Sequence, residues 1–271
     1  MFNFRGIIYD KKPLIMGILN VTADSFFDGG KYNSDKQIAE RACEILDEGG
    51  DIIDIGAMST RPNALEIPEK EEISRIEKSV KLIRKLFPNA VISIDTYRAS
   101  VAEVAINEGA DMINDISGGT FDSEMIPTIG KFQVPYCVMH TPAPPETMQN
   151  NTNYDDIIAD IMRFFSQQID KLHAHFVHDI ILDIGFGFGK TLEQNYLLIK
   201  NMETFKQLGF PLLVGISRKS MIYKLLETDA NNALNGTTVL NTIALMKGAS
   251  ILRVHDVKEA DEVRKIFLQQ K

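Results

Sequence analysis

The feature that most constrains the fold of this chain is a repeating order of short apolar runs and longer stretches with helical periodicity. This order is typical of a parallel sheet that is covered by helices. Eight apolar runs of strand character fall at Leu14–Leu19, Ile52–Ile55, Val91–Ile94, Met112–Ile113, Val134–Met139, Ile180–Leu182, Pro211–Val214 and Ile251–Leu252. Helical patterns follow them at Asp35–Glu48, Glu71–Leu86, Ser100–Glu108, Glu124–Gly130, Tyr154–Ala174, Leu192–Phe205, Leu234–Lys247 and Val257–Leu268. The alternation predicts an α/β fold, a single (β/α)8 TIM barrel, with an extra helix after the seventh strand at about Lys219–Glu227.

Length, charge and composition limit the organisation and the partners. The chain has 271 residues, 44% of them hydrophobic, so we expect residues 1–271 to form one barrel domain. Its net charge of -8 and pI near 5.2 argue against nucleic acid and anionic membranes as partners. Met1–Lys12 lacks the apolar core of a signal peptide, and no apolar run approaches the roughly 18 residues of a membrane span. We therefore expect a cytoplasmic protein.

Each predicted strand ends in a polar or ionisable residue. In a parallel barrel the carboxyl ends of all strands meet on one face, where active sites of such enzymes lie. One such residue alone is more often a helix cap, but eight on one face are difficult to explain by capping. The residues are Asn20, Asp54, Asp95, Asn114 with Asp115, His140, Asp183, the Ser217–Lys219 group, and Arg253 with His255.

The segment Ile180–Lys190 joins an apolar run to a glycine-rich loop, with Asp183 at the junction. Its spacing excludes a P-loop, because Ile184 stands where the first glycine is needed. It also excludes a dinucleotide fingerprint, because Lys190 stands in place of the third glycine. The glycines permit close approach of a flat ligand or of another backbone segment, and a tight turn capped by Asp183 is the alternative.

Two charged clusters are expected to lie outside the site. His173, His175 and His178 precede the sixth strand, at the opposite end of the barrel, and are expected to be solvated surface residues rather than metal ligands. The run Glu69–Glu72 is expected to form the acidic first turn of the second helix.

Taken in order, several segments resemble the signatures of dihydropteroate synthase. Ile15–Gly30 resembles the first signature, and Asp51–Pro62 resembles the second. The match continues in Ser93–Thr96, Ile113–Asp115, Leu182–Lys190, Gly215–Ser220 and Arg253–Asp256, over nearly the whole chain.

The resemblance implies a transferase of folate biosynthesis that binds two small-molecule substrates. It would condense 6-hydroxymethyl-7,8-dihydropterin diphosphate with 4-aminobenzoate, giving 7,8-dihydropteroate and diphosphate, with Mg²⁺ as cofactor. Diphosphate would leave first, and the arylamine would attack the cationic methylene that remains. Sulfonamides bind this family as mimics of 4-aminobenzoate. The family commonly forms homodimers, although the sequence itself offers no interface to argue from.

The residue types suit these roles. A carboxylate such as Asp183 can accept the amino group and the adjacent ring N–H of a pterin together. Lys219 can donate toward the ring carbonyl, and Asp95 can stabilise the cationic intermediate. The planar fork of Arg253 suits phosphate oxygens, and the amide oxygen of Asn20 is a suitable ligand for Mg²⁺.

The resemblance assigns the positions of this chain as follows. Catalysis falls to Asp95, Lys219, Arg253 and His255. The pterin-binding positions are Asp95, Asn114, Met139, Asp183, Gly215 and Lys219. The diphosphate positions are Asn20, which also holds the metal, with Thr60, Arg61, Arg253 and His255. The 4-aminobenzoate positions are Thr60, Arg61, Pro62, Phe188 and Ser217, and the first loop contributes Asp24 and Ser25.

Four departures from the family pattern are visible. Ala23 and Ile184 replace prolines, Asn63 replaces glycine, and Ala57-Met58 replaces Gly-Glu. The loss of prolines removes backbone restraints. The loss of the glutamate removes a charge near the second loop.

Two other functions stay open at this point. A methyltetrahydrofolate:corrinoid methyltransferase-like barrel shares the pterin-holding carboxylates, but has no diphosphate to bind. A non-catalytic pterin binder could keep the fold and lose the reaction. Diphosphate release that depends on magnesium would separate the three.

Overall fold

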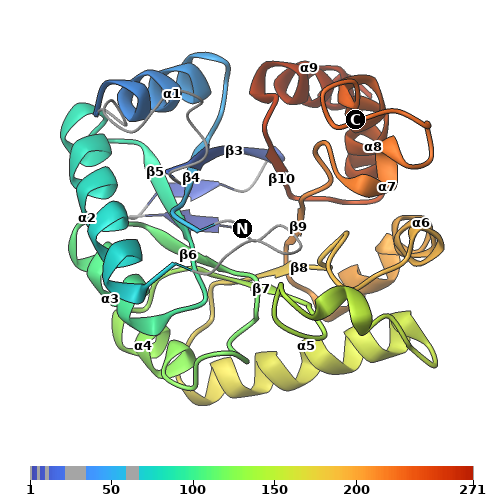
Figure 1. Ribbon diagram of the computed structural model, residues 1–271, viewed down its shortest axis with the longest axis horizontal. Coiled ribbons are helices and arrows are strands. Elements are labelled where there is room, and N and C mark those ends of the chain that lie inside the picture. Colours follow the sequence, from blue (N-terminus) through green and yellow to red (C-terminus); the bar gives the residue numbers. More distant parts are fainter. Residues whose placement is uncertain (1, 5–6, 10–11, 22–34, 59–66, 271) are drawn as a thin grey trace.

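The computed structural model describes residues 2–4, 7–9, 12–21, 35–58 and 67–270. Eight parallel strands close into a barrel in the order β10-β3-β4-β5-β6-β7-β8-β9, with helices around its outer face (Figure 1). The strands are β3 (Leu14–Asn20), β4 (Ile52–Gly56), β5 (Val91–Asp95), β6 (Met112–Asp115), β7 (Tyr136–Met139), β8 (Ile180–Asp183), β9 (Leu212–Val214) and β10 (Ile251–Val254). The predicted (β/α)8 barrel is confirmed.

The helices follow the predicted order, and several differ from the predicted bounds. They are α1 (Asp35–Asp47), α2 (Glu69–Leu86), α3 (Ala99–Asn107), α4 (Met125–Phe132), α5 (Ile157–Ala174), α6 (Leu192–Lys200), α7 (Ser220–Tyr223), α8 (Leu234–Met246) and α9 (Val257–Leu268), with 3-10 turns η2 (Met148–Asn150) and η3 (Met202–Leu208). The predicted helix Leu192–Phe205 ends early, because the side-chain amide of Asn201 donates to the carbonyl of Leu197 and caps it. The extra helix after the seventh strand is present as α7, shorter than predicted.

A short antiparallel hairpin precedes the barrel, and the sequence analysis did not predict it. Its strands are β1 (Phe2–Phe4) and β2 (Ile7–Tyr9), with Phe2 paired to Tyr9 and Phe4 to Ile7. Strands this short give too few alternating residues for a periodic signal. No described helix is both long and apolar enough to cross a membrane.

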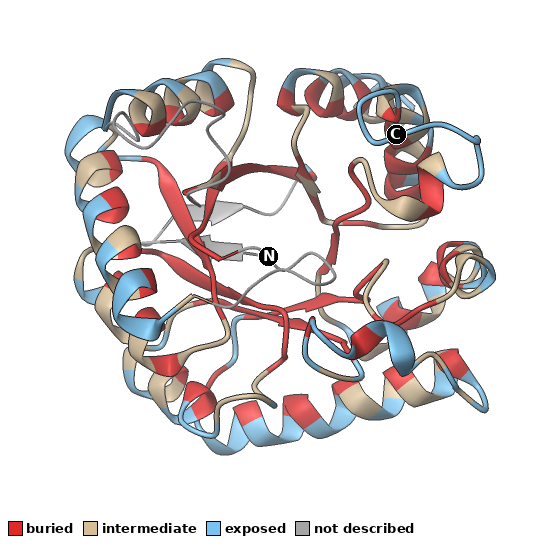
Figure 2. Cartoon of the chain, viewed as in Figure 1, coloured by how far each residue is buried: buried red, intermediate tan, exposed pale blue. Residues whose placement is uncertain are grey.

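Buried residues line the strands and parts of the surrounding helices (Figure 2), and their apolar side chains form two layers. The larger layer packs the outward faces of the strands against the buried stripes of the helices. The smaller layer fills the barrel and takes at least one residue from each strand: Leu14, Met16, Ile52, Val91, Met112, Cys137, Ile181, Leu213 and Ile251. Because side chains alternate along a strand, this apolar plug fixes which later residues of each strand also point inward.

Glycines at three helix ends turn the chain back into the barrel. Gly49, Gly109 and Gly248 have φ angles of 96°, 104° and 95°, which other residues rarely adopt. After the first two of these turns, an aspartate at the entrance of the next strand binds the neighbouring strand. Asp51 accepts a hydrogen bond from the amide of Ile15 at 2.9 Å, and Asp111 accepts one from Ile92 at 2.7 Å.

The buried Asp111 site predicts a loss of stability on mutation. Asp111 also binds Arg84 at 2.7 Å, so Asp111→Ala leaves a strand amide and a largely buried guanidinium without this partner. We expect a loss of about 3 kcal/mol in the free energy of unfolding, measured by urea denaturation. Glu103→Ala, which breaks an exposed pair with Lys131, is the control and should cost less than about 1 kcal/mol. Equal effects of the two substitutions would contradict this role of Asp111.

Candidate active site

The apolar plug and the alternation of side chains bring one set of residues to the carboxyl-end face of the barrel. Two positions beyond the plug residues, strands β4, β6 and β8 carry Asp54, Asn114 and Asp183. The same spacing continues through the ends of all eight strands. It places Asn20, Asp54, Gly56, Ser93, Asp95, Asn114, Met139, Asp183, Gly215, Arg253 and His255 on the inward side.

Arg253 is shared between two buried carboxylates. Its Nε donates to Oδ2 of Asp54 and its Nη2 donates to Oδ2 of Asp95, both at 2.6 Å. Asp54 also accepts hydrogen bonds from the hydroxyl of Ser93 at 2.6 Å and the amide of Asn114 at 3.2 Å. These contacts join four strands, β4, β5, β6 and β10, into one polar layer above the apolar plug.

Asp95 is a buried carboxylate with a raised pKa and an incomplete set of hydrogen bonds. Burial raises its pKa to about 7; the charge of Arg253 opposes this shift, and the charge of Asp54 adds to it. Its second oxygen, Oδ1, is buried and has no hydrogen-bond partner among the described residues. A ligand that offers a donor or a positive charge would satisfy that oxygen.

Asp183 and Lys219 form the other charged pair of the site. Burial raises the pKa of Asp183, and the charge of Lys219 opposes the shift. Burial lowers the pKa of Lys219 to about 8, and Asp183 opposes that shift. The Nζ atom of Lys219 donates to the carbonyl of Phe186 at 2.5 Å and lies 4.5 Å from the ring centroid of Phe188.

Lys190 shapes the glycine loop from within. Its Nζ donates to the carbonyls of Gly185 at 2.8 Å and Phe188 at 2.9 Å, and lies 3.2 Å from Nδ1 of His140. Burial lowers its pKa to about 7. The spacing argument against a P-loop agrees with this geometry, because the lysine points into its own loop rather than toward a phosphate site.

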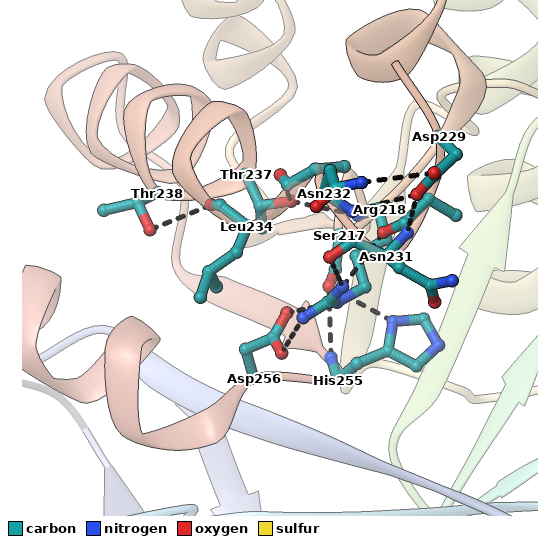
Figure 3. A network of polar contacts seen from close by, with 12 residues as sticks. Ser217, Arg218, Asp229, Asn231, Asn232, Leu234, Thr237, Thr238, His255 and Asp256 are labelled. Carbon is teal, nitrogen blue, oxygen red and sulfur yellow. Dashed lines mark hydrogen bonds and ion pairs between the residues drawn. The ribbon is translucent and has the colours of Figure 1, made fainter.

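Two further strand ends meet through side chains (Figure 3). The hydroxyl of Ser217 accepts a hydrogen bond from the amide of His255 at 3.2 Å and lies 3.1 Å from its Nδ1. Beside them, Arg218 binds Asp256 through both carboxylate oxygens, at 2.9 and 2.8 Å. The turns after β9 and β10 are therefore held together at two successive positions.

Two of the polar residues at strand ends contact the apolar layer between strands and helices instead of the inside of the barrel. Asp115 accepts hydrogen bonds from the hydroxyl of Tyr136 at 2.5 Å and the amide of Ser117 at 2.7 Å. His140 packs against Phe164, with ring centroids 5.1 Å apart, and burial lowers its pKa to about 2. Both stand one residue after an inward-facing position, which is the sequence signal that distinguishes them.

Several predicted site residues lie outside the described residues. They are Asp24, Ser25, Thr60, Arg61 and Pro62, with the departures Ala23 and Asn63. Of the other departures, Ile184 is completely buried in the outer apolar layer. Met58 is buried too, and its sulfur accepts a contact from the hydroxyl of Tyr97 at 3.8 Å.

Two oxygen atoms beside Gly56 are of the kind that magnesium takes as ligands. A Cβ at Gly56 would lie 3.6 Å from Oδ1 of Asn20 and 3.8 Å from Oδ2 of Asp95, so both oxygens border the same space. Within the described ranges, no group of three or more histidine, cysteine, aspartate or glutamate side chains could hold a metal ion. This donor set suits an ion that keeps most of its waters.

Of the two clusters expected outside the site, the histidines lie before β8, at the opposite end of the barrel. His173, His175 and His178 are exposed, and the rings of the first and last are 5.4 Å apart. Helix α2 begins with the acidic run, as predicted. Glu72 differs from its neighbours, because it is buried and binds Thr96 at 2.7 Å and Arg98 at 2.6 Å.

Comparison with known proteins gives one consistent result. Residues 16–255 match the family model described as pterin binding enzyme. Dihydropteroate synthase of Synechocystis sp. is 44% identical over 261 residues, covering 95% of this chain and 90% of that protein. The crystal structure of Yersinia pestis dihydropteroate synthase with a sulfonamide drug complex superposes with a TM-score of 0.93 at 39% identity, covering 99% and 98% of the two chains. Dihydropteroate synthase from Thermus thermophilus in complex with 4-aminobenzoate gives 0.89 at 33% identity, covering 100% and 99%.

The position of Lys190 predicts a local effect of its removal. Lys190→Met keeps the side-chain length but leaves the carbonyls of Gly185 and Phe188 without this donor. We expect a loss of about 3 kcal/mol in the free energy of unfolding and faster hydrogen exchange in residues 184–190. Lys200→Met, at an exposed lysine of the following helix, is the control. Unchanged exchange in the loop would argue against this role.

Proposed function

Because the chain belongs to the dihydropteroate synthase family of pterin-binding enzymes, we propose that it condenses 6-hydroxymethyl-7,8-dihydropterin diphosphate with 4-aminobenzoate. The products are 7,8-dihydropteroate and diphosphate. The observation that carries the proposal is one juxtaposition: two buried carboxylates, Asp95 and Asp183, lie on the same barrel face as Lys219 and Arg253. A heterocycle rich in hydrogen-bond donors needs carboxylates as acceptors, and an anionic leaving group needs cations close to them.

In this proposal the pterin binds between strand ends. Asp183 accepts the amino group and the ring N–H through its carboxylate, and Lys219 donates toward the ring carbonyl. Asn114 and Met139 border the same face, and Gly215 leaves room for the ring. A Cβ at Gly215 would lie at ordinary contact distance, 3.8 Å from Cβ of Arg253 and 4.0 Å from Nζ of Lys219, so this position borders both cations.

The reaction transfers the pterin methylene from oxygen to nitrogen. The C–O bond breaks, diphosphate leaves with the electron pair, and the cationic methylene is attacked by the arylamine, which then loses a proton. The unpartnered Oδ1 of Asp95 supports a role in stabilising that cation. Ser217 and Phe188 face the arylamine, with Thr60, Arg61 and Pro62 completing its pocket.

The leaving diphosphate needs cationic partners. Arg253 on β10, His255 just after it and Arg61 provide them, and Thr60 adds a hydroxyl donor. The loop residues Asp24 and Ser25 would approach the closed site. Asn20 would hold Mg²⁺ through its amide oxygen, and the bound ion would neutralise charge on the diphosphate. The partners in this proposal are the pterin diphosphate and 4-aminobenzoate. We also propose that the protein is a homodimer and is cytoplasmic.

Diphosphate release by the purified protein tests the proposal. We expect release from the pterin diphosphate with magnesium that depends on 4-aminobenzoate and matches the 7,8-dihydropteroate formed. Asp95→Asn should lower turnover by about 10²-fold or more, because the carboxylate that stabilises the cation is lost. Pterin binding without any product would identify a non-catalytic binder, and would refute the synthase.

Lys219 predicts a pH dependence of pterin binding. Burial places its pKa near 8, so the lysine is charged below that pH and neutral above it. Affinity for the unphosphorylated pterin should therefore fall as the pH rises through 8, when Lys219 loses a donor and its charge. Titration calorimetry between pH 6.5 and about 9.5 measures this, and Lys219→Arg, which stays charged, corrects for titration of the ligand itself. The same pH dependence in both proteins would exclude Lys219 as the cause.

A further inference from the structure

Arg218 holds a backbone conformation that its residue type disfavours. Its φ angle is 55°, in the left-handed region that favours glycine. It stands between Ser217 and Lys219, two residues of the proposed site. A disfavoured conformation at a site persists only when the surrounding contacts enforce it.

The side chain of Arg218 makes these contacts, and it uses most of its donors within the protein. Nε and Nη2 bind both oxygens of Asp256, and Nη1 donates to the carbonyls of Ala230 at 2.9 Å and Asn231 at 2.7 Å. Its backbone amide donates to the hydroxyl of Thr237 at 3.0 Å. Arg218 therefore joins three segments and has little capacity left for a substrate.

Asp256 binds Arg218 instead of capping its own helix. It is the N-cap residue of α9, where an aspartate ordinarily accepts a hydrogen bond from the first turn of the helix. Here its side chain makes no capping hydrogen bond. Its two oxygens instead face the guanidinium, in the bidentate geometry that fixes direction as well as distance (Figure 3).

The salt bridge lies directly beside the contact between Ser217 and His255. Each partner of the salt bridge is the next residue in the chain after a partner of that contact. We therefore expect a change in the salt bridge to alter how the hydroxyl of Ser217 and the imidazole of His255 lie relative to each other.

We propose that Arg218 and Asp256 are positioning residues that set the distance between the arylamine pocket at Ser217 and the diphosphate site at His255. The identity of the two ligands rests on the function proposed above. The pterin carboxylates Asp95 and Asp183 stand on β5 and β8 and are held by other contacts. Lys219, the third pterin residue, has its own contact to the carbonyl of Phe186. Loss of the salt bridge should therefore affect the arylamine more than the pterin.

Kinetics of three variants test this proposal. Arg218→Lys removes the guanidinium that binds both oxygens of Asp256, and Asp256→Asn removes the carboxylate charge. Each variant should raise the KM for 4-aminobenzoate by about tenfold or more and lower kcat. The Kd of the unphosphorylated pterin should change by less than about threefold, because its carboxylates are not moved. The double variant should be no worse than the poorer single variant, since both remove one interaction.

Arg218→Gly separates the side chain from the backbone. Glycine adopts the left-handed conformation without strain, so it keeps the turn and deletes the salt bridge. We expect the same rise in KM as in Arg218→Lys. A wild-type KM in Arg218→Gly would overturn the proposal, because only the backbone conformation would then matter.

The control is a matched pair far from these turns. Arg163 binds Asp160 at 2.9 Å on α5, and Arg163→Lys should leave kcat and KM unchanged.

Hydrogen exchange of residues 215–223 and 253–258 gives a measurement that does not need turnover. Faster exchange of both segments in Arg218→Lys and Asp256→Asn supports the proposal, and unchanged exchange refutes it. Lack of turnover in the wild type would refute the proposed function instead.

Discussion

The site depends on one buried cation shared between two carboxylates. Arg253 donates to both Asp54 and Asp95, and its charge opposes the rise that burial causes in the pKa of Asp95. Ser93 and Asn114 also donate to Asp54, so within the described part of the chain this layer leaves only Oδ1 of Asp95 without a hydrogen-bond partner. A buried network with a single unsatisfied atom is stable enough to fold and still favours a ligand at that atom.

The polar layer around Arg253 separates two ends of the barrel that have different roles. Below it, the apolar plug and the strand-entry aspartates Asp51 and Asp111 hold the strands in register. Above it, the strand ends carry carboxylates, amides and cations, and burial shifts the pKa values of Asp95, Asp183 and Lys219. Burial that raises the pKa of Asp95 and lowers that of Lys219 keeps both near neutral pH, where each can still respond to a bound ligand.

Much of this arrangement could be predicted from the sequence, because strand order and side-chain alternation follow from apolar periodicity alone. Asn114 and Asp183 could be placed at strand ends for that reason. The sequence analysis treated Asp115 and His140 as equal members of the face, although they stand one residue out of phase and pack outward. The hairpin β1-β2 and the early end of α6 depend on strands of three residues and on one asparagine, which leave no periodic signal.

The glycine loop shows why motif spacing alone cannot assign a ligand. A Cβ at Gly185 would lie 2.1 Å from the carbonyl oxygen of His140, and one at Gly189 would lie 2.2 Å from Cγ of Pro142. These glycines are required by the neighbouring chain after β7, and Lys190 binds the carbonyls of its own loop. The loop thereby presents the carbonyl of Phe186 to Lys219, so the glycines act on the site through the backbone that they allow to pack. A glycine-rich strand end followed by lysine can therefore indicate the support of a site as readily as a contact with phosphate.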